Sequence, residues 1–311
     1  MRGVFSQWLA RACQADERII VLTGDHGYSL FDDVRRECPE QYLNAGVAEQ
    51  NLIGVAAGLA KGGFRPIAYG LGAFIPIRVL EQIKLDICYE NLPVLLIGDG
   101  AGVVYSTLGT SHQCAEDIAA LRALPNISIL SPADDHEMSA CLNEALHTTG
   151  PCYLRIGKAD RGTVHEQNVQ LQGGRLLSVR TGAGPLVWIA TGSMVQAALT
   201  MAQQWPNSDI WSAPVIKPLD IDHVVAICRS HRAVIVLEEH SIYGGLGSAI
   251  AEIASEHAPT WVCRIGIRDR FSEKCGSYSY LLAEHGLDTP GITAQVHAFL
   301  KRMNCRPAVA A

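Results

Sequence analysis

Short apolar runs alternate with longer segments of helical periodicity along almost the whole chain, and this alternation restricts the possible folds more than any other feature. The runs of the first half read RIIVLTG, RPIAYGL, PVLLIGDG, ISILSP and CYLRIG, and each is typical of a buried strand. Helical patterns separate them near residues 49–61, 77–89, 116–124 and 134–147. The alternation predicts an α/β fold in which helices cover both faces of a mostly parallel sheet.

The 311 residues are enough for two domains of ordinary size. Between about 158 and 184 the rhythm gives way to glycine, glutamine, arginine and threonine, as in LQGG and RTGAGP. A second alternating series follows, with the strand-like runs PLVWIATG, DIWSAP, AVIVLEEH and TWVCRIGI. We predict a first domain at 1–158, a linker at 159–184, and a smaller second domain of the same class at 185–311.

Charge and hydropathy exclude two classes of partner. The chain has 25 Lys plus Arg against 31 Asp plus Glu, a net charge of -6, and no basic run with interleaved aromatic residues, so we expect no nucleic-acid binding. No apolar run reaches the roughly 18 residues that a membrane-spanning helix needs. The first 18 residues alternate apolar and charged positions at helical spacing, which predicts a first helix and no signal peptide.

Ten cysteines are scattered along the chain without a C-x-x-C pair, and several fall on apolar positions of predicted helices. This distribution is typical of reduced thiols in the core of a cytoplasmic protein, and less so of a disulfide framework or a zinc site. We expect no metal site made by this chain alone.

Ligands of parallel sheets bind beyond the carboxyl ends of the strands, so the segments that follow strands are the candidate sites. Glu49 is the single carboxylate between Tyr42 and Gly63, where small and apolar residues predominate. A glutamate in the first turn of a helix is also favoured by the helix dipole, so a structural role stays open for it. The segments YGLGAFIPIR and GDGAGVVYSTLGTSHQCAED follow two further strands.

Taken together, LNAGVAEQNLIGVAAGLAKGGFRPI resembles the pyrimidine-binding domain of the transketolase family, which includes the deoxyxylulose phosphate synthases and two-subunit relatives. The resemblance continues in family order through FIPIRVLEQIKLDICYENLPV, GTSHQCAEDIAALRALPNISILSPADDHE, GPCYLRIG, VIKPLD and VLEEHSIYGGLGSAIAE. It covers nearly the whole chain, and the second domain resembles the C-terminal domain of the same family.

The resemblance implies thiamine diphosphate as cofactor. Glu49 matches the glutamate that bonds a ring nitrogen of the aminopyrimidine, Phe74 the aromatic residue that stacks on this ring, and His112 the histidine that reaches the donor substrate. The competing interpretations are a core phenylalanine and a solvated histidine. Arg78 has the place of an arginine found in many members, and we include it in the cofactor site.

Arg155 and Lys158 follow the last strand of the first domain, where relatives bind the acceptor phosphate. The alternative for both residues is an ion pair or an interface contact. The sequence also departs from the family: YSTLGTSHQ lacks the aspartate of the usual GEDGPTHQ loop, and Gly100 replaces the arginine of the synthases. These losses argue against the usual sugar phosphates as substrates.

The sequence GDG at 98–100, followed by Asn126, imitates the spacing with which thiamine enzymes bind magnesium and diphosphate. We interpret it as a coincidence, because Asn126 begins a strand and so faces away from the ligand edge. The resemblance thus implies that the diphosphate-binding domain, with its magnesium, is on a separate N-terminal subunit. It also implies a homodimeric core within a complex of two plus two chains.

These inferences lead to one functional hypothesis and two alternatives. The hypothesis is the C-terminal subunit of a split transketolase-like enzyme, active only with its partner, which transfers a two-carbon ketol unit from a ketose or 2-oxo donor to an aldehyde. The first alternative is the beta subunit of a 2-oxo acid or acetoin dehydrogenase. The second is a noncatalytic assembly or regulatory subunit. For EEH at 238–240 we predict a structural or interface role.

Overall fold

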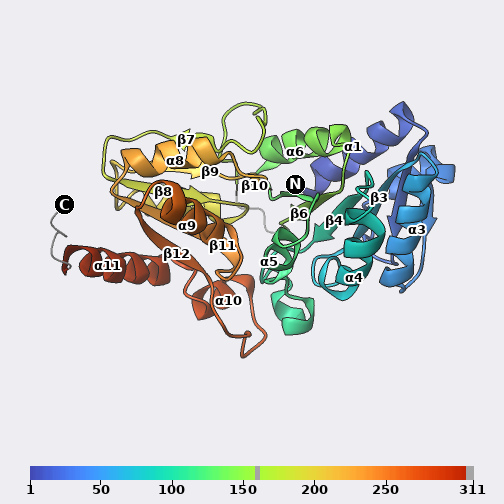
Figure 1. The fold of residues 1–311 in the computed structure, drawn as a ribbon. Helices are drawn as coiled ribbons and strands as arrows, with labels where there is room; N and C mark the ends of the chain where they lie inside the picture. The colour runs from blue at the N-terminus through green and yellow to red at the C-terminus, as the bar shows by residue number, and fades with distance from the viewer. Residues whose placement is uncertain (158–161, 306–311) are drawn as a thin grey trace.

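The computed structural model describes residues 1–157 and 162–305. Two sheets form the two halves of the molecule, each flanked by helices (Figure 1). The first sheet has seven strands in the order β10-β5-β6-β4-β3-β1-β2, and the second has five in the order β12-β11-β8-β9-β7. The predicted fold class, two mostly parallel sheets with helices on both faces, is confirmed.

Six strands of the first sheet are parallel, so their carboxyl ends meet at one edge. They are β1 (Ile19–Thr23), β2 (Tyr42–Asn44), β3 (Arg65–Leu71), β4 (Leu95–Asp99), β5 (Ser128–Leu130) and β6 (Cys152–Ile156). The short β2 lies at the outer end of the sheet, beside β1. The sequence pattern missed β2, because three residues are too few to show a period.

Helices cover both faces of this sheet (Figure 1). One face carries α1 (Arg2–Ala15), α2 (Asp32–Glu37) and α6 (Asp135–His147), and the other carries α3 (Glu49–Lys61), α4 (Leu80–Gln82) and α5 (Asp117–Arg122). The α6 helix begins where predicted because the Asp134 side chain accepts a hydrogen bond from the Glu137 N–H at 2.9 Å. The predicted helix at 77–89 is less regular: a 3₁₀ turn (Ile77–Val79) precedes α4, and a π-helical segment (Ile83–Cys88) follows it.

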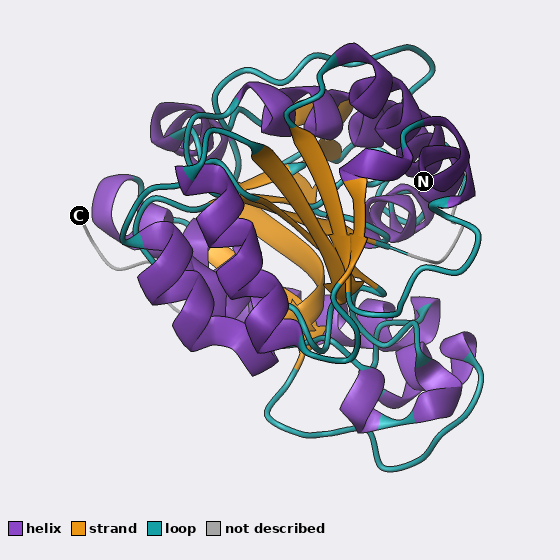
Figure 2. Cartoon of the chain, turned by 90° about the vertical axis from the view of Figure 1, so that its right-hand side faces the viewer, coloured by secondary structure: helices purple, strands orange, loops and turns teal. Residues whose placement is uncertain are grey.

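Helices likewise enclose the second sheet. Figure 2 turns the right-hand side of Figure 1, which is the first domain, toward the viewer and shows strands running between helices. Its parallel strands are β8 (Leu186–Ala190), β9 (Asp209–Ser212), β11 (Ala233–Ser241) and β12 (Trp261–Ile267). One face packs on α7 (Met194–Met201), α10 (Tyr278–Glu284) and α11 (Thr289–Cys305). The other packs on α8 (Ile221–Ser230) and α9 (Leu246–His257).

Two strands do not follow the predicted division of the chain. Strand β7 (Leu177–Arg180) lies inside the stretch predicted as a linker, and it forms the antiparallel edge of the second sheet. Strand β10 (Val215–Lys217) comes from the second half of the chain but pairs antiparallel with β5. The edge strand of the first sheet is therefore supplied by a segment of the chain that lies beyond the predicted domain boundary.

Among the described residues, no helix is both long enough and apolar enough to cross a lipid bilayer.

Candidate active site

Four of the predicted site residues lie on segments that leave the carboxyl edge of the first sheet. Glu49 follows β2, Phe74 and Arg78 follow β3, and His112 follows β4. Contacts link the first three directly, and the Phe74 and His112 rings lie 5.5 Å apart between centroids. The structure therefore brings together Glu49, Phe74, Arg78 and His112.

A turn after β2 positions Glu49. Gly46 has a φ of 70°, which favours glycine, and its N–H donates to the Asn44 side chain at 2.9 Å. This turn places the first residue of α3 at the ligand edge, and Glu49 is buried with 4% of its surface exposed. Its Oε1 atom is buried and has no hydrogen-bond partner of good geometry among the described residues. A buried carboxylate oxygen of this kind is costly unless a ligand or a cation meets it.

Close packing of two loops sets the place of Phe74. The Phe74 N–H donates to the Leu71 carbonyl at 2.8 Å, so the chain turns immediately after β3. A Cβ atom on Gly72 would lie 2.9 Å from Cys114 Sγ, so only glycine lets this turn approach the loop that carries His112. Phe74 is partly exposed, as an aromatic residue that receives a flat ligand must be.

Arg78 lies between the two residues that are predicted to hold the aminopyrimidine. Its Nη1 atom is 3.0 Å from Glu49 Oε1, and its Cζ atom lies 3.9 Å from the centre of the Phe74 ring. In the sequence Glu49 is the single carboxylate of a small and apolar segment, but in the structure it pairs with the Arg78 cation. The residues around Glu49 in the sequence give no sign of this pair, because Arg78 lies on the segment that follows β3.

The loop that carries His112 is closed by its own backbone and held by the second domain. Gly102 and Cys114 exchange two backbone hydrogen bonds, at 3.0 and 2.8 Å, and the Val103 N–H donates to Glu239 Oε1 at 3.0 Å. His112 ends a 3₁₀ turn, and its Nδ1 atom lies 3.0 Å from the Ser111 hydroxyl. The ring is partly exposed beside Phe74, where it is available to a ligand.

His26 lies beside these residues and was not predicted from the sequence. Its ring centroid lies 5.6 Å from that of Phe74, and its Nδ1 atom is buried without a hydrogen-bond partner in the described part of the chain. Burial lowers the pKa of His26, although Glu49 and Asp25 oppose this effect. The neutral imidazole is thus favoured. His26 follows β1, so the rule that places ligands after strands was sufficient to find it.

Asp99 of the GDG segment is a buried carboxylate that contacts two other side chains. Asp99 Oδ2 accepts a hydrogen bond from the Tyr69 hydroxyl at 2.6 Å and lies 3.6 Å from Arg2 Nε. Asn126 precedes β5, at the opposite edge of the sheet, and donates to the Cys88 carbonyl at 2.9 Å. The two residues cannot share a ligand, in line with the interpretation of this motif as a coincidence. The described residues hold no group of three or more His, Cys, Asp or Glu arranged for a metal.

Arg155 has a structural environment. Its guanidinium is 3% exposed and donates to Asp117 Oδ2 at 2.7 Å and to the carbonyls of Cys114 and Glu239 at 2.8 and 3.1 Å. These contacts favour the ion-pair alternative over phosphate binding, because they already use Nε and Nη2 of a buried side chain. Lys158, the other predicted phosphate ligand, lies outside the described residues.

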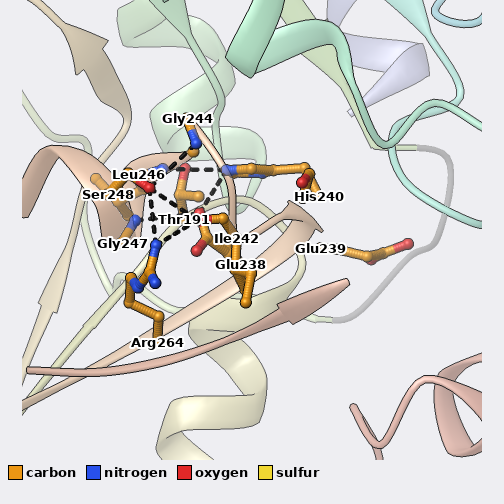
Figure 3. A network of polar contacts seen from close by, with 12 residues as sticks. Thr191, Glu238, Glu239, His240, Ile242, Gly244, Leu246, Gly247, Ser248 and Arg264 are labelled. Carbon is orange, nitrogen blue, oxygen red and sulfur yellow. Dashed lines mark hydrogen bonds and ion pairs between the residues drawn. The ribbon is translucent and has the colours of Figure 1, made fainter. Parts of the chain in front are cut away.

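The EEH segment ends β11, and its side chains diverge (Figure 3). Glu239 points toward the first domain and contacts Val103, Ser193 and Tyr278. Glu238 lies 2.7 Å from His240 Nε2 and accepts the Gly247 N–H at 3.1 Å, so this pair holds the start of α9. These contacts agree with the structural or interface role predicted for EEH.

Comparisons with known proteins cover almost the whole chain. The family described as "Transketolase, pyrimidine binding domain" matches residues 1–162, and "Transketolase, C-terminal domain" matches residues 179–292. A protein named 6-deoxy-6-sulfo-D-fructose transketolase subunit SqwH, from Clostridium sp. (strain MSTE9), is 32% identical over 98% of this chain and 96% of its own length.

Two further relatives differ in how much of them the chain covers. 1-Deoxy-D-xylulose-5-phosphate synthase 1 of Geobacter metallireducens is 34% identical over 96% of this chain, which spans only 49% of that protein. A solved structure titled "Split gene transketolase, inactive beta4 tetramer" superposes with a TM-score of 0.88 and 34% identity, over 96% of this chain and 98% of the other.

Proposed function

Because the chain belongs to the transketolase family and spans its pyrimidine-binding and C-terminal domains, we propose that Glu49 and Phe74 grip the aminopyrimidine of thiamine diphosphate. The single observation that carries this proposal is the buried Glu49 Oε1 atom, which has an ion-pair contact with Arg78 but no hydrogen bond of good geometry among the described residues, and which lies in the same cluster as a partly exposed aromatic ring. Related subunits of split enzymes support the assignment to the C-terminal subunit of a transketolase.

The residues present fit the cofactor. Glu49 would accept a hydrogen bond from a ring nitrogen and hold a proton there, and Phe74 would stack on the ring. When bound, thiamine diphosphate supplies the electron sink that lets a carbon–carbon bond beside a carbonyl break. The buried setting of Glu49 excludes water from the shared proton, which strengthens this hydrogen bond.

Two histidines are suited to the substrate side of the site. His112 would donate a hydrogen bond to a hydroxyl or carbonyl oxygen of the donor, since its ring is partly exposed next to Phe74. His26, whose pKa is lowered by burial, would accept a proton from a hydroxyl at neutral pH. His112 would then be the hydrogen-bond donor and His26 the proton acceptor, which together are the minimum needed to move a proton within the site.

We propose that a separate N-terminal subunit binds the diphosphate and its magnesium. The chain spans about half of the synthase relative but nearly all of the split subunits, which supports a missing half on another polypeptide. Magnesium prefers phosphate and carboxylate oxygens in octahedral geometry, so the subunit that holds the diphosphate would also hold the metal. The buried cysteines among the described residues support a cytoplasmic enzyme.

An exposed face of α3 supports a homodimeric core within a complex of two plus two chains. Gly54 and Gly58 are exposed, and a Cβ atom on either would meet nothing within 4 Å. Nearby, Val47, Leu85 and Tyr89 expose 76%, 49% and 81% of their surfaces. Small residues beside exposed apolar ones are typical of a surface that another chain covers.

The reaction that we propose is transfer of a two-carbon ketol unit from a ketose or 2-oxo donor to an aldehyde. The altered loop at 106–108 and the buried ion pair of Arg155 argue against the usual sugar phosphates, so the substrate screen should include unphosphorylated and otherwise substituted sugars. The names of the relatives favour neither the dehydrogenase nor the noncatalytic alternative.

The test replaces Glu49 with Gln in the pair reconstituted from this chain and its N-terminal partner. We expect ketol transfer to fall at least about 100-fold, the lower range for loss of a proton-transfer group, with an unchanged unfolding midpoint. Glu17→Gln, on an exposed glutamate of the first domain, is the matched control and should keep full activity. An E49Q pair as active as the control would refute the assignment.

A further inference from the structure

Arg78 contacts both Glu49 and Phe74, the two residues proposed to hold the cofactor ring. Its guanidinium is a flat cation with N–H donors, 3.0 Å from a Glu49 oxygen and 3.9 Å from the centre of the Phe74 ring. A carboxylate acceptor and an aromatic face are the two partners that a flat ring with an N–H donor also requires. Arg78 makes both contacts that the proposed cofactor would make.

These two sets of contacts exclude each other. Glu49 Oε1 is buried, and the cationic Arg78 Nη1 lies 3.0 Å from it. A ring that bonded this oxygen and stacked on this face of Phe74 would overlap the guanidinium. We propose that Arg78 is an internal stand-in for the aminopyrimidine, which caps the site in the free subunit and swings out when the cofactor enters.

The surroundings of Arg78 suit such a movement. Its side chain is 46% exposed, and it sits in the 3₁₀ turn at Ile77–Val79, outside the regular helices. A half-exposed ion pair is weakened by solvent and by salt, so it is readily exchanged for a better-fitting partner. The cap also neutralises Glu49 while no cofactor is bound, which removes the penalty of a buried unpaired charge.

This inference rests on the proposed function, and it predicts a sign opposite to that of an arginine that helps to hold the cofactor. If Arg78 is a cap, then Arg78→Ala strengthens the binding of an aminopyrimidine. If Arg78 is a cofactor ligand, the same change weakens binding. The exposed Arg11 on α1 offers a matched control, Arg11→Ala.

The experiment is calorimetric titration of the full chain with the free aminopyrimidine alcohol that forms half of thiamine. We expect R78A to bind about 3- to 10-fold more tightly than the wild type, since a half-exposed ion pair and a cation–π contact no longer compete. R11A should bind like the wild type, and E49Q/R78A should lose the gain. Unchanged, weaker or undetectable binding by R78A overturns the proposal.

A second readout observes Arg78 itself. The side-chain nitrogen signal of Arg78, assigned by its absence from R78A, should shift when the aminopyrimidine alcohol is added to the wild-type chain, and an unmoved signal at saturation contradicts the cap. Failure of the cap and failure of the proposed function remain distinguishable. The activity of the reconstituted E49Q pair decides the function alone, whatever the titrations of R78A give.

Discussion

Arg155 Nε donates to Asp117 Oδ2 over 2.7 Å, with the two side chains 3% and 0% exposed. The same carboxylate oxygen accepts the Tyr153 hydroxyl at 2.8 Å. Burial opposes the charge of Asp117, but Arg155 and the hydrogen bonds hold the pKa of the carboxyl below its usual range. Since Arg155 also reaches the Cys114 and Glu239 carbonyls, the pair ties the His112 loop to both domains.

Arg155→Met should lower the free energy of unfolding by about 3–5 kcal/mol, because it leaves the Asp117 carboxylate buried without its cation. Urea denaturation of the isolated chain measures the loss. The double variant R155M/D117L should recover part of it, since no buried charge remains. A loss below about 1 kcal/mol for the single variant would return Arg155 to the list of possible phosphate ligands.

Phe74→Leu should weaken the binding of thiamine diphosphate to the reconstituted pair by roughly 10-fold, because leucine fills space but offers no ring for stacking. Phe74 is partly exposed, so the fold should tolerate the change. The control is Phe64→Leu, on a phenylalanine that is 38% exposed at the other edge of the sheet, before β3. Equal cofactor affinities for the two variants would contradict the stacking role.

His26 gives a pH dependence with a definite sign. Burial lowers the pKa of His26 below its ordinary value of 6.5. Well above pH 6.5 the His26 ring is neutral in both the folded and the unfolded chain, so it adds nothing to the pH dependence of stability. As the pH falls through 6.5, the unfolded chain takes up a proton that the folded chain resists, so stability is lost down to the folded pKa.

The difference between the wild type and His26→Gln isolates this effect. Between pH 7.5 and pH 5.5, on the order of one unit either side of the reference pKa, the wild type should lose more unfolding free energy than H26Q, which has no proton to take up. Urea denaturation at both values provides the measurement, with each protein's own result at the higher pH as reference. Parallel losses would show that the burial of His26 has no effect on its protonation.

Gly58→Gln should separate folding from assembly. In the isolated helix, glutamine replaces glycine with a gain of up to about 1 kcal/mol, and its Cβ meets nothing within 4 Å. Gly58 lies on the face that we propose as the interface between two copies of this chain. The longer side chain should block their association, and light scattering would then give a smaller mass for the protein in solution. Gly3→Gln, at a similarly open position of α1, should leave the mass unchanged. Equal masses for both variants would remove α3 from the interface.

The sequence predicted the elements whose pattern is local. Helix α3 runs from Glu49 to Lys61 as predicted, because a run of small and apolar residues ends at Gly62, which caps the helix. Strands β7 and β10 escaped prediction because three or four residues carry no period, and their pairing depends on partners distant in the sequence.

The site shows the same division. Glu49, Phe74 and His112 were predicted as site residues because they follow strands within matched motifs. The contact of Arg78 with Glu49 joins the segments after two separate strands and has no signature in either segment. Arg155 shows the converse: a cation after a strand looks available, and only the fold reveals that Asp117 already pairs with it. The sequence thus predicts where a residue lies relative to the strands, but it does not predict whether its side chain is already paired with another.

The place of β10 determines how this protein can be divided. A chain cut anywhere between the two domains would deprive β5 of β10, its outer neighbour, and leave residues 128–130 paired with β6 alone. The backbone of these residues would then form a bare sheet edge, which invites pairing with other molecules. The pyrimidine-binding half would also lose the Glu239 acceptor that steadies Val103. A gene that encoded this half by itself would therefore yield a product prone to aggregate.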